Sequence, residues 1–124
     1  MKLSVIIISF QSDHLLKKIL ISVPKKYQII IVENSMLKST KKLEKKFKNL
    51  SVITPSKNLG YAKAFNLALK KCKNNFVLTI TPDVLINKNL IIKIEKVIDK
   101  LKNFTLLAPE YKNQKIYKNY TSFD

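Results

Sequence analysis

Residues 58–83 read NLGYAKAFNLALKKCKNNFVLTITPD, and we divide them into a loop, a helix, a buried strand and a final carboxylate. Apolar residues recur at helical spacing after Gly60, the only glycine of the chain. The run 76–81 is short and largely apolar, as is typical of a strand covered on both faces. Pro82 breaks this strand and leaves Asp83 just beyond its end. Open α/β sheets bind ligands at the carboxyl ends of their strands, so Asp83 is a candidate for binding, with capping of the next helix as the alternative.

The same alternation of segments continues on both sides of this stretch. Short apolar runs predict further strands at 3–10, 27–33, 50–54 and 104–108. Helical spacing of apolar residues predicts helices between Ser12 and Pro24, over 37–47 and over 88–102. Strands that alternate with helices form βαβ units, so we expect one layered α/β domain with a mostly parallel sheet over residues 1–124. We expect the end of the chain, about 110–124, to be loosely held.

The composition limits the kind of protein. The 124 residues are enough for one domain, and a hydrophobic share of 46% argues against disorder. A single glycine excludes the glycine-rich phosphate loops of common nucleotide-binding proteins. One cysteine and one histidine cannot form an internal disulfide or a structural zinc site, so we expect a reducing, cytoplasmic setting. We interpret His14 as a surface residue and Cys72 as a packing residue.

The formal net charge is +16, from 24 basic residues, all lysine, against 8 acidic residues. Without arginine the chain lacks the usual side chain for bidentate contacts to guanine, so we expect no specific nucleic-acid partner. Two interpretations of the lysines remain open: a coding bias, or a field that attracts polyanions and anionic lipids. No apolar run reaches the roughly 20 residues that span a bilayer. A peripheral contact with the anionic inner face of a membrane is therefore the membrane role that we expect.

Polar side chains gather where the predicted strands end. These residues are Ser9, Gln11, Glu33, Asn34, Asn58, Thr81 and Asp83. Because the carboxyl ends of parallel strands meet at one edge, we expect these groups to converge on a cleft that binds a ligand. The alternative is that they cap helices, as Ser, Asn and Asp commonly do after strands. Glu33 fits that alternative least, because four apolar residues precede it and no helix clearly starts with it.

The order of these features resembles the family-2 glycosyltransferases, enzymes of the GT-A fold. The similar parts are the opening strand 3–10, the strand end 30–35, the stretch 58–66, the strand start 76–78 and the end 81–83. Thr81-Pro82-Asp83 is similar to the Asn-Pro-Asp of the rhamnosyltransferase-like branch. The resemblance covers about residues 2–110 and implies a three-layer helix–sheet–helix core, with a mostly parallel, Rossmann-like sheet of order 3-2-1-4 plus a fifth strand.

The resemblance also implies a nucleotide-diphosphate-sugar donor and a glycan or lipid-linked acceptor, in cell-surface polysaccharide biosynthesis. Glu33 would contact the nucleoside, with Asn58 and Gly60 near the nucleotide. Asp83 would bind a divalent ion, Mg²⁺ or Mn²⁺, that bridges the diphosphate of the donor. The remaining residues that we assign to the nucleotide sugar on this basis are Ser9, Gln11, Asn34 and Thr81.

In the family, a second half supplies the acceptor surface and the general base, and no residue of this chain is nominated as that base. We therefore expect a truncated glycosyltransferase that requires a partner chain or associates with itself. Two alternatives remain open. One is a non-catalytic module that binds a nucleotide sugar. The other is a lysine-rich α/β domain that binds anions or nucleic acid.

Overall fold

Runs rich in isoleucine and valine form the strands of this protein, and segments with helical spacing connect them. A computed structural model describes residues 3–101 and 103–108. In chain order the elements are β1 (Leu3–Ser9), α1 (Asp13–Ser22), β2 (Gln28–Glu33), the 3-10 helix η1 (Lys38–Lys45), β3 (Leu50–Ile53), α2 (Gly60–Leu69), β4 (Phe76–Ile80) and α3 (Lys88–Lys100). Each expected strand up to β4 is present, and each is one residue shorter at one end than expected.

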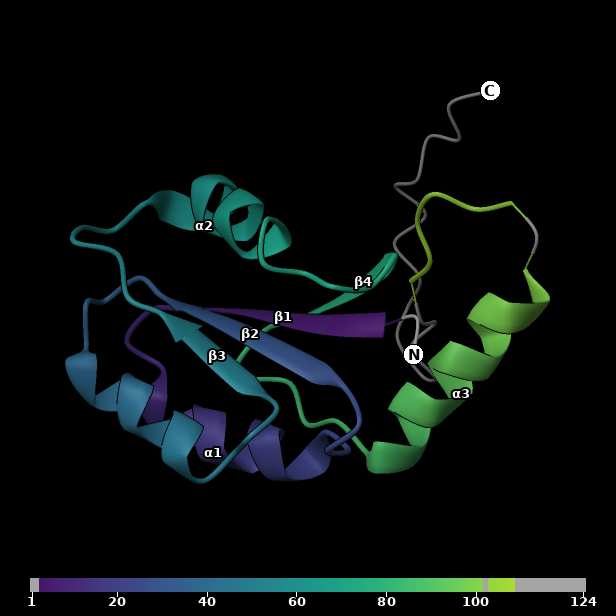
Figure 1. The fold of residues 1–124 in the computed structure, drawn as a ribbon, viewed down its shortest axis with the longest axis horizontal. Coiled ribbons are helices and arrows are strands. Elements are labelled where there is room, and N and C mark those ends of the chain that lie inside the picture. The colour runs from purple at the N-terminus through teal and green to yellow at the C-terminus, as the bar shows by residue number, and fades with distance from the viewer. Residues whose placement is uncertain (1–2, 102, 109–124) are drawn as a thin grey trace, which may run out of the picture.

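The four strands form one sheet in the order β3-β2-β1-β4, and every neighbouring pair is parallel (Figure 1). This confirms the predicted order 3-2-1-4. The central strands β1 and β2 carry continuous apolar runs because the sheet is covered on both faces. Their register pairs Ser9 with Glu33, so the last residues of both strands lie side by side at the carboxyl edge of the sheet.

Two apolar clusters lie on the two faces of the sheet. On one face, α1 and α3 contribute Leu16 and Ile91 to a core with alternate residues of all four strands. On the other face, α2 packs against Ile30 and its neighbours through Ala64 and Ala68, which are fully buried. These small side chains let the backbone of α2 approach the sheet closely. No helix among the residues described is long and apolar enough to cross a bilayer.

The structure corrects two of the expectations. The predicted fifth strand at 104–108 is not a strand; Phe104 instead stacks on Phe76, with ring centroids 5.4 Å apart. Leu106 is 87% exposed, so this run lacks the cover that a buried strand requires. The helix expected at 37–47 is the 3-10 helix η1. Its i to i+3 hydrogen bonds include those from the N–H of Thr40 to the carbonyl of Leu37 and from the N–H of Lys46 to the carbonyl of Leu43. The expected loose tail, 110–124, lies outside the described residues.

Candidate functional site

The residues predicted to bind a ligand follow the carboxyl ends of the strands. Since all strand pairs are parallel, these ends lie along one edge of the sheet (Figure 1). Ser9 ends β1, Glu33 ends β2, and Asn58 stands in the loop between β3 and α2. Thr81 follows β4 directly. Parallel topology therefore brings the predicted set to one edge, as the order of the sequence motifs implied.

Glu33 is a buried carboxylate whose oxygens both accept hydrogen bonds. The backbone N–H of Ser35 donates to Oε1 at 3.0 Å, and the Ser35 hydroxyl donates to the same oxygen. The hydroxyl of Thr40, from η1, donates to Oε2 at 3.3 Å. A fully buried carboxylate needs such donors because it has lost its water. Glu33 thus holds η1 and the loop after β2 together, a structural role that the sequence did not reveal.

Asn34 is the residue that joins three segments of the edge. Its backbone N–H donates to the carbonyl of Ser9 at 2.7 Å. Its side-chain amide donates to the carbonyl of Gly60 at 3.2 Å and accepts from the N–H of Leu59 at 3.3 Å. The loop before α2 is tightened further by Asn58, which accepts from the N–H of Gly60 at 2.8 Å. Asn34 is 3% exposed, so its hydrogen bonds are shielded from competing water.

The loop after β1 is tied to the same network. Gln11 has a positive φ of 51°, which is uncommon for a residue other than glycine. Its backbone N–H donates to the Ser35 hydroxyl at 2.7 Å, so Ser35 connects Gln11 to Glu33. Ser35 and Thr40 are the members of this network that sequence reasoning did not assign. The position of Ser35 directly after Glu33 and Asn34 was the one available signal.

Two hydroxyls near this edge are buried without a hydrogen-bond partner in the part of the chain that the structure describes. They belong to Ser9, at the end of β1, and to Thr54, directly after β3. Buried polar groups are nearly always paired, because an unpaired one loses its hydrogen bonds to water. Ser9 was a predicted site residue, and Thr54 was not. The Ser9 hydroxyl can therefore offer a hydrogen bond to a ligand bound among the predicted residues.

Asp83 lies in the turn after β4. The N–H of Val84 donates to the carbonyl of Thr81 at 3.1 Å, which closes this turn and leaves the side chain of Asp83 exposed. Asp83 does not cap the next helix, because Asn87 is the N-cap of α3 and accepts from the N–H of Asn89 at 2.7 Å. That alternative for Asp83 is therefore wrong.

The site offers an ion few protein ligands. No group of three or more His, Cys, Asp or Glu side chains that could hold a metal occurs within residues 3–101 and 103–108. One exposed carboxylate, that of Asp83, fits a Mg²⁺ or Mn²⁺ ion only when substrate phosphates and water supply the other ligands. The donor set is therefore compatible with an ion that arrives with a diphosphate.

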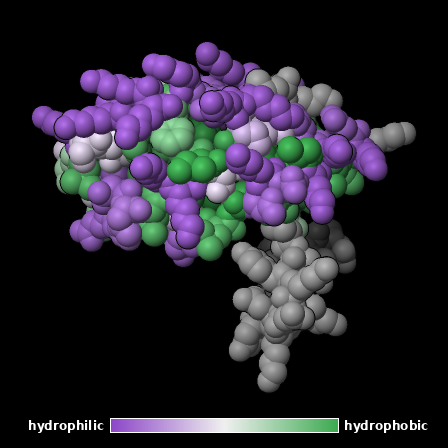
Figure 2. All heavy atoms as spheres, turned by 90° about the horizontal axis from the view of Figure 1, so that it is seen from below, coloured by the Kyte–Doolittle hydropathy of each residue, from purple (hydrophilic) through white to green (hydrophobic). Residues whose placement is uncertain are grey.

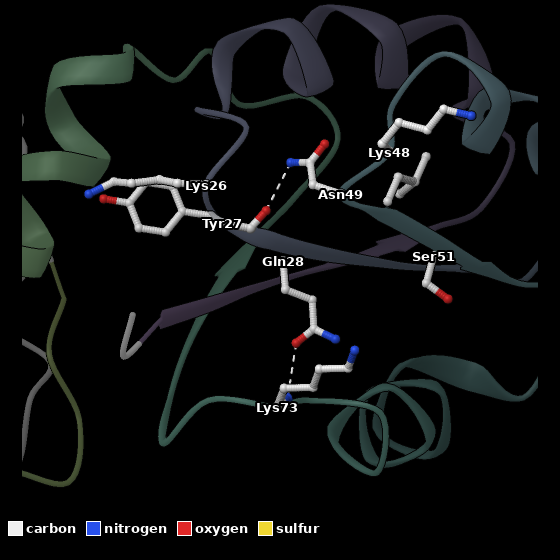
Figure 3. Close-up of a pocket in the computed structure, with 8 residues that line it drawn as sticks. Lys26, Tyr27, Gln28, Lys48, Asn49, Ser51 and Lys73 are labelled. Atoms are coloured by element: carbon white, nitrogen blue, oxygen red, sulfur yellow. Dashed lines mark hydrogen bonds between the residues drawn. The ribbon is translucent and has the colours of Figure 1, made fainter.

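A separate hollow of about 370 Å³ lies at the opposite edge, beside the amino ends of β2 and β3 (Figure 3). Asn49 donates to the carbonyl of Tyr27 at 2.8 Å, and the N–H of Lys73 donates to the side chain of Gln28 at 2.9 Å. These polar groups hold neighbouring loops together, and none of the predicted site residues lines the hollow. It is not the site that the sequence motifs predict.

His14 and Cys72, the last two side chains considered from the sequence, lie in the positions expected of a surface residue and a packing residue. His14 is exposed on α1. Cys72 packs against the α2 face of the sheet, and burial raises the pKa of its thiol, although a hydrogen bond with Ser4 acts in the opposite direction. A raised pKa leaves less reactive thiolate at neutral pH. Cys72 therefore serves packing, as expected.

Comparisons with known proteins support a family assignment. Residues 4–122 match the model of the family described as glycosyl transferase family 2. The crystal structure of S. aureus TarS 1-349 is 29% identical and covers 81% of this chain, with a TM-score of 0.70. The crystal structure of S. aureus TarS is 30% identical over 81% of this chain, with a TM-score of 0.67. This chain spans 33% and 20% of the length of those two.

A search of curated proteins finds no significant match. Together with the strand order, these similarities confirm the predicted GT-A fold.

Proposed function

Since the chain belongs to glycosyl transferase family 2, we propose that it binds a nucleotide-diphosphate sugar at the carboxyl edge of its sheet, for transfer of the sugar to a glycan or lipid-linked acceptor. The observation that carries this proposal is the network around Asn34, which fixes the loops after β1, β2 and β3 against one another. Loops that are already fixed bind a ligand without a further cost of ordering.

The diphosphate would lie near the start of α2. A helix begins there with backbone N–H groups that lack intrahelical partners, and its dipole favours an anion. The positive φ of Gly60, +71°, together with the bond to Asn58, sets the direction in which the chain enters this helix. Further polar groups at the same edge are the Ser9 hydroxyl, which has no hydrogen-bond partner among the described residues, and the exposed hydroxyl of Thr81.

Asp83 would hold the divalent ion of the donor complex. Its carboxylate is exposed and makes no hydrogen bond or ion pair with the part of the chain that the structure describes, so it remains available to a ligand. A bound Mg²⁺ or Mn²⁺ would stabilise negative charge on the leaving diphosphate. Because a single carboxylate contributes, we expect the ion to bind weakly until a diphosphate is present.

A non-catalytic module that binds a nucleotide sugar is the second candidate function. The surroundings of Glu33 and the role assigned to Asp83 favour this candidate. Glu33 is buried and held by donors from Ser35 and Thr40, while Asp83 is assigned to the ion. Neither is free to take the proton of an acceptor hydroxyl. Turnover of a nucleotide sugar with candidate acceptors distinguishes a transferase from such a module.

The test is calorimetric titration of the whole chain with UDP and dTDP, with and without Mg²⁺ or Mn²⁺. We expect metal-dependent binding of at least one nucleotide, weakened about tenfold or more by Asp83→Asn, because the ion then loses its protein ligand. Asp13→Asn changes the net charge equally at an exposed position and should bind like the parent.

Absence of nucleotide binding under every metal condition would exclude both candidate functions. A lysine-driven polyanion binder would instead bind single-stranded DNA, with an affinity that falls steeply with salt.

A further inference from the structure

The apolar face of α3 is wider than the part that the sheet covers. Ile91 and Ile98 point into the core and are buried. Leu90, Val97 and Leu101, in contrast, remain 37%, 41% and 41% exposed. At about 100° per residue, these three positions fall within about 40° of one another around the helix axis. They lie along one side of the helix over about 16 Å, and we call these three residues the α3 stripe.

Exposed leucines also precede and follow α3 in the sequence. Leu85 lies before the helix and is 71% exposed, and Leu106 and Leu107 follow it and are exposed as well. Scattered single apolar residues are normal on protein surfaces, but three on one helical stripe are not scattered. The face of the molecule in Figure 2 consists mainly of hydrophilic side chains with small apolar areas between them.

Lysines flank the α3 stripe on the side that faces away from the sheet. By helical geometry Lys93, Lys96 and Lys100 lie within about 60° of one another there, and all three are exposed. On the opposite flank, the carboxylate of Glu95 accepts from Lys26 at 2.7 Å and from the Tyr27 hydroxyl at 2.6 Å, so its charge is compensated within the protein. The open flank of the stripe therefore carries three lysines, on a chain of net charge +16, while the exposed Asp99 lies farther around the helix, opposite the stripe.

We propose that α3 docks onto an anionic membrane surface, with Leu90, Val97 and Leu101 entering the boundary between headgroups and acyl chains. Lys93, Lys96 and Lys100 would then contact the negatively charged headgroups. An amphipathic helix with a lysine-rich polar face and an apolar stripe has the composition of an interfacial helix. Lysine is a flexible point charge and suits mobile headgroups, which require no bidentate geometry.

Charge and area favour a lipid surface over a second copy of this chain. In an antiparallel pair of α3 helices, Lys93 and Lys100 would flank the contact and meet the same lysines of the other copy. Three partly exposed side chains also fall well short of the roughly 800 Å² per partner that a stable protein interface buries. A membrane needs neither a matching pocket nor a large area, because each lysine that faces the surface adds its own attraction to the headgroups.

The test is cosedimentation of the 124-residue chain with vesicles of phosphatidylcholine alone or with 30% phosphatidylglycerol. We expect binding to the anionic vesicles and none to the neutral ones. A stripe variant, Leu90→Gln with Val97→Gln and Leu101→Gln, should lower the partition coefficient about tenfold or more. A flank variant, Lys93→Gln with Lys96→Gln and Lys100→Gln, should lower it by a similar factor. Circular dichroism and urea denaturation verify that the variants are folded.

The matched control removes the same charge elsewhere. Lys42, Lys45 and Lys46, in and beside η1, are exposed, and their replacement by glutamine should lower binding less than threefold. Equal losses in the η1 and flank variants, or full binding by the stripe variant, would reduce the effect to general lysine adsorption and overturn the proposal. So would a parent chain that ignores anionic vesicles. A dimer in light scattering that the stripe variant dissociates, without vesicle binding, would assign α3 to a protein partner instead. The nucleotide titration is independent of all these outcomes.

Discussion

The buried hydroxyl of Ser9 allows a test that distinguishes a role in folding from a role in binding. Its hydroxyl is buried and has no partner among the residues described, so the fold gains little from it. We expect Ser9→Ala to change the free energy of unfolding by no more than about 0.5 kcal/mol, while nucleotide affinity falls about three- to tenfold because a hydrogen bond to the ligand is lost.

Urea denaturation and calorimetry measure these two effects on the same sample. Thr54→Val is the control, because Thr54 has the same unpaired, buried hydroxyl but was not predicted to bind the nucleotide. A Ser9→Ala protein that is strongly destabilised would mean that the hydroxyl serves the fold. Unchanged affinity would remove Ser9 from the site.

Gly60 allows a prediction about backbone conformation alone. A Cβ atom added at this position would meet no atom within 4 Å, so substitution causes no steric clash with the surroundings. Its φ of +71° nevertheless lies in the left-handed region, which costs an ordinary residue about 1–2 kcal/mol. We expect Gly60→Ala to lose about that much stability in urea denaturation, and Gly60→Asn to lose less, since asparagine tolerates this region. Equal stabilities of both variants and the parent would contradict the assignment of φ.

At the scale of elements, α3 is linked to the start of β2 by the group of Glu95, Lys26 and Tyr27. The hydrogen bond from Lys26 lowers the pKa of Glu95 below its ordinary 4.5, and the bond from Tyr27 adds to this effect. A carboxylate with a lowered pKa in the folded state contributes stability above its unfolded pKa. That contribution disappears as the pH falls through the folded pKa. The link should therefore stabilise the protein at neutral pH and fail in acid.

Glu95→Gln tests this link. At pH 7 we expect the variant to unfold at lower urea than the parent, because the charged acceptor of two hydrogen bonds is missing. The difference should shrink as the pH falls from 4.5 through the lowered pKa of Glu95, because the parent then loses the charge on this carboxylate. Lys17→Gln, on the exposed surface of α1, should show no such pH dependence. A difference between parent and Glu95→Gln that is constant across this range would refute the electrostatic explanation.

The elements of this fold were largely predictable, and the exceptions have physical reasons. Continuous Ile and Val runs identify β1 and β2 because both faces of the central strands are buried. The run 104–108 is also largely apolar, although it has no Ile or Val, and Phe104 is held by its ring against Phe76 and not by strand pairing. The hydrogen-bond type of η1 was equally beyond prediction, because only its thin apolar stripe can be read from the sequence. Composition identifies apolar segments but not the partners that they find.

The sequence predicts that the candidate residues share one edge of the sheet, but it does not predict the hydrogen bonds between them. Parallel order brings Ser9, Glu33 and Asp83 to one edge, whatever the details of the loops. The contacts of Ser35 and Thr40 with Glu33 depend instead on loop conformations such as the positive φ values of 51° at Gln11 and 62° at Met36. These conformations have no clear sequence signal, since neither residue is glycine. A network built from such loops therefore becomes visible only in three dimensions.

For the whole molecule, we expect self-association to depend on two opposing factors, the net charge and an open edge of the sheet. Within the residues described, β4 pairs only with β1, so its other edge presents free backbone groups over a run that contains no charge or proline. The net charge of +16 keeps copies apart at low ionic strength. Salt screens this repulsion, because the Debye length falls from about 30 Å at 0.01 M to about 3 Å at 1 M. We expect light scattering to report a monomer at 20 mM NaCl and growing mass at 1 M.

A charge placed on the edge strand should suppress this growth. Thr79 is exposed on β4, and Thr79→Lys adds a lysine of the kind that protects natural edge strands. Ser56→Lys adds the same charge on an exposed loop away from β4 and should associate like the parent at 1 M salt. If both variants are equally protected, net charge alone controls association and the β4 edge has no special part. If the parent stays monomeric at every salt concentration, the free edge of β4 does not act as a pairing surface, and the self-association expected from the sequence is wrong.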